Sequence, residues 1–123
     1  MTTICLVDDS ETILMSVSQN LEQAGYRVDK FPSAEEALEH LQEGDPPDIL
    51  ITDLNMPGMD GISFIKEVRG IPAMRFKPIL FLTTESEQSK RDEAKAAGAT
   101  GWLVKPASPE DLLGAIRQVS PGG

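Results

Sequence analysis

The sequence predicts an α/β protein built on one mainly parallel sheet with helices on both faces. Short apolar runs alternate along the chain with segments of helical periodicity, which is typical of repeated βα units. Three of these runs end in charged residues, at Asp8-Asp9, at Asp53 and at Lys105. Because the carboxyl ends of parallel strands meet at one edge of a sheet, we expect these side chains to gather in one site.

Five strands are predicted from the apolar runs, at residues 3–8, 26–31, 48–53, 78–83 and 101–104. A helix should follow each strand, beginning after Asp9-Ser10, at Ser33, after Asp60-Gly61, at about Ser86 and at Ser108-Pro109. The second start, Ser33-Ala34-Glu35-Glu36, is a capping-box pattern. The fourth helix, ending near Ala97, is charged nearly all round, which predicts weak anchoring to the sheet.

Length and cysteine content indicate one domain over residues 1–123 in a reducing compartment. The single Cys5 lies in an apolar strand, where we expect inert core packing. The chain starts without a signal pattern, and no apolar run approaches the roughly 18 residues of a membrane span. We therefore expect a cytoplasmic monomer that is neither secreted nor embedded in a membrane.

The charge balance excludes whole classes of partner. With 20 acidic against 11 basic side chains, the net charge of -9 repels nucleic-acid backbones and anionic lipid. The chain also lacks a Gly-rich dinucleotide turn and a phosphate-binding loop ending in Gly-Lys-Ser or Gly-Lys-Thr. Direct nucleic-acid or nucleotide binding therefore has no support.

The acidic strand ends suit a hard cation such as Mg²⁺, which prefers oxygen ligands and keeps several waters. Asp9 and Asp53 are the expected side-chain ligands, Asp8 would hold a coordinated water, and the backbone carbonyl of Asn55 would supply another oxygen. Three crowded carboxylates repel one another, so the cluster calls for a metal ion or the Lys105 ammonium.

Asp53 is the expected nucleophile for phosphoryl transfer, because a carboxylate can attack phosphorus to form an aspartyl-phosphate. Lys105 and the Thr83 hydroxyl would then neutralise charge on the transferred oxygens, beside the metal ion. Each of these residues also has a simpler interpretation taken singly, as a helix cap, a strand residue or a strand-end charge. Only their joint placement indicates chemistry.

Several other polar or sulfur-containing residues are assigned no chemistry. Asp60 is expected to form the turn and cap of the third helix. His40 is predicted to be a solvated surface residue on the second helix. Met56, Met59 and Met74 fit either an adaptable contact surface or gap filling.

From Ile4 to Val119 the chain resembles the receiver domain of two-component response regulators. The motifs that carry the resemblance are Asp8-Asp9, the segment from Asp53 to Gly61, Thr83, and Lys105-Pro106. The resemblance implies a flavodoxin-like (βα)5 fold, doubly wound with strand order 2-1-3-4-5. It also implies Mg²⁺-dependent phosphorylation of Asp53 by a phosphohistidine on a partner, and a cis Lys105-Pro106 bond.

The resemblance further implies a switch in which Thr83 moves toward the phosphate and the aromatic Trp102 turns inward. Trp102 stands where Tyr or Phe is usual, so the indole is either a switch, locked outward, or a binding anchor. Ala107 stands where an aromatic residue often follows Lys-Pro. Asn55 and Glu85 occupy positions that influence phosphate lifetime, and this pair is similar to that of short-lived chemotaxis regulators.

The expected function is that of a stand-alone chemotaxis regulator, because no output domain follows the fifth helix in the sequence. Its implied partners are a histidine kinase or a histidine phosphotransfer protein, with a flagellar motor switch protein as one output and a phosphate-sink role as another. It would be a signalling switch that catalyses its own phosphorylation and dephosphorylation. Alternatives are a relay intermediate outside chemotaxis, a degenerate scaffold, or an aspartyl-phosphate phosphohydrolase, which typically needs Asp-x-Asp where this chain has Asp53-Leu54-Asn55.

Overall fold

The computed structural model describes residues 2–120, which form one sheet of five parallel strands in the order β2-β1-β3-β4-β5. The α/β fold class and the strand order are thereby confirmed. Each predicted strand is present, with its ends moved by at most one residue. The strands are β1 Thr3–Val7, β2 Arg27–Phe31, β3 Ile49–Thr52, β4 Ile79–Thr83 and β5 Gly101–Val104.

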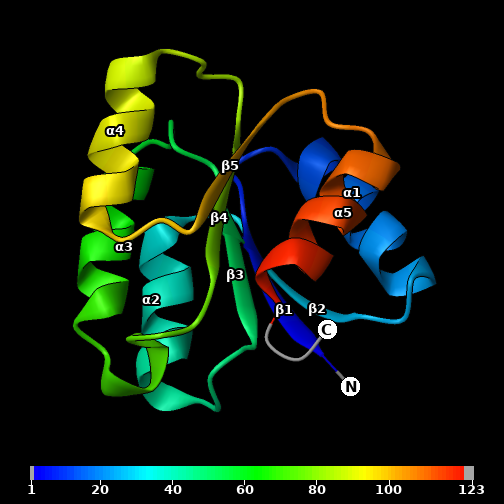
Figure 1. Cartoon of the computed structure of the whole chain (residues 1–123). Helices are drawn as coiled ribbons and strands as arrows, with labels where there is room; N and C mark the ends of the chain where they lie inside the picture. Colours follow the sequence, from blue (N-terminus) through cyan, green and yellow to red (C-terminus); the bar gives the residue numbers. More distant parts are fainter. Residues whose placement is uncertain (1, 121–123) are drawn as a thin grey trace.

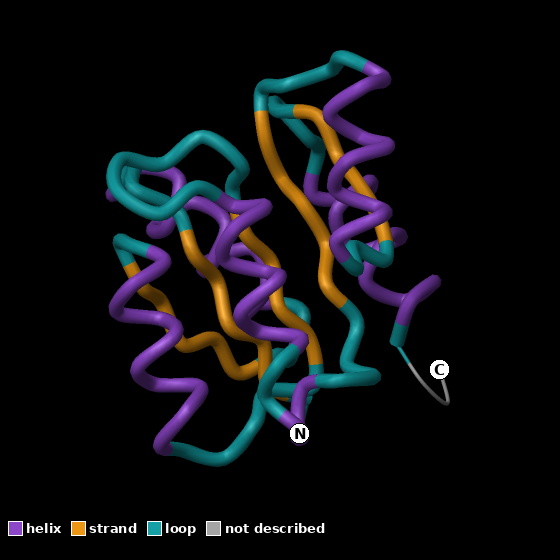
Figure 2. The backbone as a smooth tube through the Cα atoms, turned by 90° about the vertical axis from the view of Figure 1, so that its left-hand side faces the viewer, coloured by secondary structure: helices purple, strands orange, loops and turns teal. Residues whose placement is uncertain are grey.

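Helices cover both faces of the sheet, as Figure 1 shows. α1 and α5 lie on one side, and α2, α3 and α4 lie on the other (Figure 1). Figure 2 shows the connecting loops gathered at the two ends of the strands. The helices are α1 Glu11–Gln23, α2 Ala34–Glu43, α3 Gly61–Arg69, α4 Gln88–Ala97 and α5 Pro109–Val119, with an unpredicted 3-10 turn, η1, at Pro72–Met74.

The core is divided by the sheet into two apolar layers, because successive strand residues point to opposite faces. Leu50 of β3 packs in the layer under α2, α3 and α4, while Ile49 and Ile51 pack in the layer under α1 and α5. All residues of β3 are buried, as expected for a central parallel strand. None of the described helices is long and apolar enough to cross a membrane.

The predicted helix starts are capped by side chains. Four N-cap residues accept a hydrogen bond from the backbone N–H three positions on: Ser10, Ser33, Asp60 and Ser108. α4 is the exception, because Glu87 at its N-cap provides no side-chain hydrogen bond. Within α4, every residue of which is described, Ala94 alone is buried, which confirms the weak anchoring.

The prediction for His40 is wrong. His40 is half-buried, and its ring packs on Phe31 of β2 with the centroids 4.9 Å apart. Met56 and Met74 are buried, so they fill the core and do not form a contact surface. The core position of Cys5 is confirmed, and burial, with a smaller contribution from Asp29, raises the pKa of its thiol to about 12.

Arg69 at the end of α3 binds backbone carbonyls from two other segments of the chain. Its Nη1 donates to the carbonyls of Met74 at 2.7 Å, Arg75 at 3.1 Å and Lys77 at 2.7 Å. Its Nη2 and Nε donate to the carbonyl of Gly98, the C-cap of α4, at 2.7 and 3.2 Å. α4 is therefore held at its C-terminal end and is uncapped at its N-terminal end.

Replacing Arg69 by Met should destabilise the fold strongly, because the carbonyls that the guanidinium binds lose their charged donor. We expect the free energy of unfolding in urea to fall by about 2–4 kcal/mol. Arg75→Met changes an exposed arginine in the adjoining loop and should cost less than about 0.5 kcal/mol. Equal losses for the two variants would contradict this role of Arg69.

Candidate phosphoryl-transfer site

The predicted site residues lie just beyond the last paired residues of three strands. The amide of Asp8 donates to the Phe31 carbonyl, and the amide of Asp53 donates to the Val7 carbonyl. The Lys105 amide donates to the Thr83 carbonyl in the same way. Because the strands are parallel and in register, these backbone bonds bring residues distant in sequence to one edge of the sheet.

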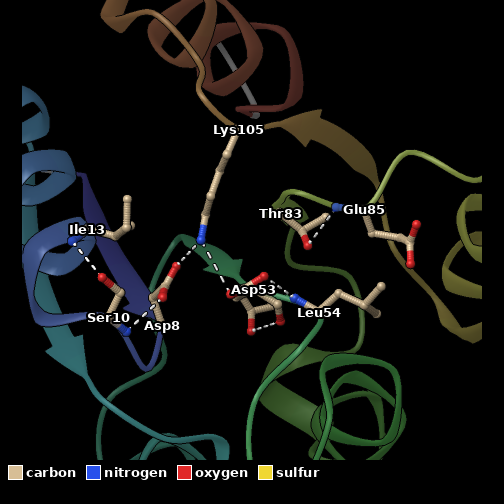
Figure 3. A network of polar contacts seen from close by, with 9 residues as sticks. Asp8, Ser10, Ile13, Asp53, Leu54, Thr83, Glu85 and Lys105 are labelled. Carbon is tan, nitrogen blue, oxygen red and sulfur yellow. Dashed lines mark hydrogen bonds and ion pairs between the residues drawn. The ribbon is translucent and has the colours of Figure 1, made fainter.

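The Lys105 ammonium joins two carboxylates at the centre of the site (Figure 3). Its Nζ lies 2.6 Å from Oδ2 of Asp8 and 3.3 Å from Oδ2 of Asp53. The second oxygen of each carboxylate accepts a backbone N–H, from Ser10 to Asp8 and from Leu54 to Asp53. Both carboxylates are therefore fixed in orientation before any ligand enters.

Asp9 completes an acidic group with Asp8 and Asp53. One carboxylate oxygen from each of the three residues lies within 4.8 Å of the others, with Asp8 and Asp53 buried and Asp9 exposed. Carboxylate oxygens are hard donors, and the exposed third member leaves one side open to water, as Mg²⁺ requires. The donor set therefore fits the magnesium ion that the sequence predicts.

The electrostatics of the pair are set by burial and by the opposite charge. Burial is the largest cause that raises the pKa of Asp8, and the hydrogen bonds from Lys105 and Ser10 offset it only in part. Burial alone would lower the pKa of Lys105, but its hydrogen bond with Asp8 and the charge of Asp53 outweigh that effect and raise it. The lysine therefore stays cationic, and Asp8 holds a proton more readily than a free aspartate.

Thr83 and Trp102 are linked through the backbone of Glu85. The buried Oγ1 of Thr83 accepts a hydrogen bond from the Glu85 amide at 3.3 Å. Nε1 of Trp102 donates to the Glu85 carbonyl at 3.0 Å, and the indole packs on Phe81 with the ring centroids 5.3 Å apart. The half-buried indole is therefore bonded to the segment that connects β4 to α4 and is not turned away from it.

The loop from β3 to α3 carries Asn55, which is exposed two residues beyond Asp53. This loop turns tightly onto the site, because the Gly61 amide donates to the Leu54 carbonyl at 2.8 Å. A Cβ on Gly61 would lie 2.4 Å from the Asp53 carbonyl oxygen and 2.7 Å from the Phe81 ring. The Asp60-Gly61 pair predicts the turn but not this close approach, since no local sequence pattern reports a contact with β4.

Beside the site, a groove of about 360 Å³ runs between α1 and the segment that follows β5. Its walls include Val17, Leu82, Pro106 and the small side chain of Ala107. Lys105 also lines it, so the groove adjoins the candidate site. The Lys105-Pro106 peptide bond is cis, as the resemblance implies.

Comparisons with known proteins agree with this site. The family model described as the response regulator receiver domain matches residues 4–117. The chain is 36% identical over 110 residues to chemotaxis protein CheY-3 of Vibrio cholerae, covering 89% of this chain and 84% of that protein. It is also 36% identical over 114 residues to the phosphate regulon transcriptional regulatory protein PhoB of Rhizobium meliloti, covering 93% of this chain and 50% of that protein. The chain thus spans about half the length of PhoB.

The structure of Vibrio cholerae chemotaxis protein CheY4 superposes with a TM-score of 0.92 at 46% identity, covering 97% of this chain and 98% of that one. The chain therefore belongs to the response regulator receiver family. Its relatives include two CheY proteins, of whose chains it covers 84% and 98%.

Magnesium should stabilise the folded chain more at a pH above the window in which folded Asp8 loses its proton than at a pH below that window. Folding raises the pKa of Asp8, so the folded chain holds this proton more tightly than the unfolded chain does. The contribution of Asp8 to stability therefore declines as the pH rises from the pKa of Asp8 in the unfolded chain to its pKa in the folded chain. Proton loss over the same window frees the carboxylate, so metal affinity rises. Thermal unfolding with and without Mg²⁺ at both pH values measures this difference.

Two variants serve as controls for the magnesium measurement. Asp9→Asn should abolish the thermal shift, because it removes one of the predicted ligands. Asp111→Asn removes the same charge from exposed α5 and should keep the shift. A shift that is independent of pH, or that survives in Asp9→Asn, would contradict the assignment.

Proposed function

We propose that this chain is a response regulator that accepts a phosphoryl group on Asp53 in a Mg²⁺-dependent reaction and thereby switches its binding to another protein. The observation that carries the proposal is the arrangement of one ammonium and three carboxylates, Asp53 among them, at the strand ends. The family supplies the donor class, a phosphohistidine on a histidine kinase or a histidine phosphotransfer protein.

In the proposed reaction, a carboxylate oxygen of Asp53 attacks phosphorus as the bond from phosphorus to the donor's imidazole nitrogen breaks. The imidazole leaves with the electron pair of that bond and takes up a proton from water. Lys105, whose Nζ lies 3.3 Å from Oδ2 of Asp53, would bind an oxygen of the transferred group. Thr83 supplies a hydroxyl to a second oxygen.

Asp8, Asp9, Asp53 and the Asn55 carbonyl would hold Mg²⁺, which when bound offsets negative charge on the carboxylates and the phosphoryl group. Lys105 has a second role, because it neutralises Asp8 at 2.6 Å and so limits the charge that the site accumulates. With these roles, catalysis depends on the orientation of the reacting groups and on the electrostatic stabilisation of the transferred group, as expected for phosphoryl transfer.

The output of the proposed switch begins at Thr83. Its hydroxyl now accepts the Glu85 amide, so turning toward a phosphoryl group would break this bond and release the segment that precedes α4. Glu85 is also bonded to Trp102, so the indole would respond to the same event. α4 has no side-chain cap at its N-terminal end and buries only Ala94, so moving that end would break few contacts.

A chemotaxis role is supported by the similarity to CheY proteins, at 36% and 46% identity. A flagellar motor switch protein and a kinase that uses the chain as a phosphate sink are the two outputs that fit such a role. Within this proposal the chain is a signalling switch and not a phosphohydrolase, because Asn55 replaces the second acid that such hydrolases typically carry. Repeated hydrolysis of a phosphomonoester by the purified chain would favour the hydrolase instead.

Incubation with acetyl phosphate and Mg²⁺ should add one phosphoryl group, seen as a single increment in intact mass. The addition should vanish in Asp53→Asn and without Mg²⁺, because the nucleophile or the charge-neutralising ion is then missing. After removal of the donor, we expect the increment to decay within seconds to minutes. A phosphorylated Asp53→Asn variant, or a lifetime of hours, would contradict the respective assignment.

The fluorescence of Trp102, the single tryptophan of the chain, should change when Asp53 is phosphorylated. In Thr83→Val, which keeps the shape but removes the hydroxyl, the change should be much smaller at equal phosphorylation measured by mass. The reason is that Thr83 is the proposed link between the phosphoryl group and Glu85. An unchanged fluorescence response in Thr83→Val would show that Trp102 does not report through this link.

A further inference from the structure

The first turn of α2 touches the loop that carries Asn55. Oε2 of Glu35 accepts a hydrogen bond from the backbone amide of Met59 at 3.1 Å, across 24 positions of sequence. Gly58, with φ at +79°, lies against the same carboxylate, since a Cβ there would be 2.5 Å from Oε2. The absence of a side chain at Gly58 is what allows this approach.

This contact holds the distal part of the loop between β3 and α3. The proximal part is already bound, because the Leu54 amide donates to Oδ1 of Asp53 at 2.7 Å and the Leu54 carbonyl accepts from Gly61 at 2.8 Å. Asn55 lies between these bonds and the one at Met59. The path of the backbone at Asn55 is therefore fixed from both sides.

The neighbouring acid on α2 has a different contact, so helix capping does not explain Glu35. Oε2 of Glu36 accepts a hydrogen bond from Ser33 Oγ at 3.1 Å, and Glu36 donates its amide to Ser33 Oγ at 3.2 Å. Glu36 therefore belongs to the local cap, while Glu35 bonds to a distant loop. Both lie in the first turn, where either charge interacts with the helix dipole alike.

We propose that Glu35 is a positioning residue for the metal site: it holds the loop from β3 to α3 and so limits the positions that the Asn55 carbonyl can take. This inference rests on the proposed function, which assigns that carbonyl to Mg²⁺. Glu35 itself touches neither the metal nor the phosphoryl group. Its effect is to reduce the number of loop conformations that metal binding would otherwise have to order.

Titration calorimetry with Mg²⁺ on the full chain tests this, using Glu35→Ala, Glu35→Gln and the matched control Glu36→Ala. Glu35→Ala should bind Mg²⁺ roughly threefold to tenfold more weakly, below the effect of losing a direct partner of a ligand. Glu35→Gln keeps an oxygen that accepts the Met59 amide and should stay within about twofold of the unaltered chain. Glu36→Ala should keep the affinity while it lowers the melting temperature.

Amide hydrogen exchange without metal gives an independent measurement. In Glu35→Ala, the amides of residues 58–60 should exchange faster than in Glu36→Ala, because the loop has lost its bond to α2. Equal affinity and equal exchange in these two variants would overturn the inference. An affinity loss in Glu35→Gln as large as in Glu35→Ala would also overturn it, since the charge would then be responsible.

The failure of the proposed function is distinguishable from the failure of this inference. A wild-type chain that neither binds Mg²⁺ nor takes phosphate from acetyl phosphate overturns the proposed function, and with it the positioning of a metal ligand by Glu35. A wild-type chain that does both, with a Glu35→Ala variant indistinguishable from it, overturns the inference alone.

Discussion

The ion pair between Lys105 and the carboxylates of Asp8 and Asp53 is the interaction on which the rest of the site depends. Two buried acids at neighbouring strand ends repel each other and lose hydration, and a cation between them offsets both costs. Lys105 reaches them from β5, the edge strand, which is separated from β1 by β3 and β4. The site therefore exists only when the whole sheet is assembled in order.

The same arrangement orients the carboxylates before a phosphoryl group arrives, but burying them costs free energy on folding. The carboxylates are held by backbone amides and by the ammonium, so little reorganisation is needed when a phosphoryl group arrives. The cost appears in the raised pKa of Asp8, which shows that burial disfavours its charged form even beside Lys105. A divalent cation bound by the same oxygens would relieve this cost, which couples folding stability to metal binding.

Stability is distributed unevenly around this centre. Arg69 fixes the C-terminal end of α4 with a charged donor, and the N-terminal end is held through Glu85, which both Thr83 and Trp102 bind. Changes at the phosphoryl site can therefore reach the surface through Glu85, while the opposite end of the helix stays in place. The β3 to α3 loop is held in a comparable way by Glu35, on the other side of Asp53.

The sequence alone determined the α/β class, the strand segments and the capped helix starts, because these depend on residues within a few positions of one another. It also determined the chemical types at the strand ends, Asp8, Asp9, Asp53, Thr83 and Lys105. Only the tertiary structure decided what packs against them: that His40 lies on Phe31, that Trp102 bonds to Glu85, that Gly61 admits no Cβ, and that Arg69 and Glu35 hold distant loops. Such contacts join residues brought together by the register of the sheet and the packing of helices on it, and no local periodicity carries that information.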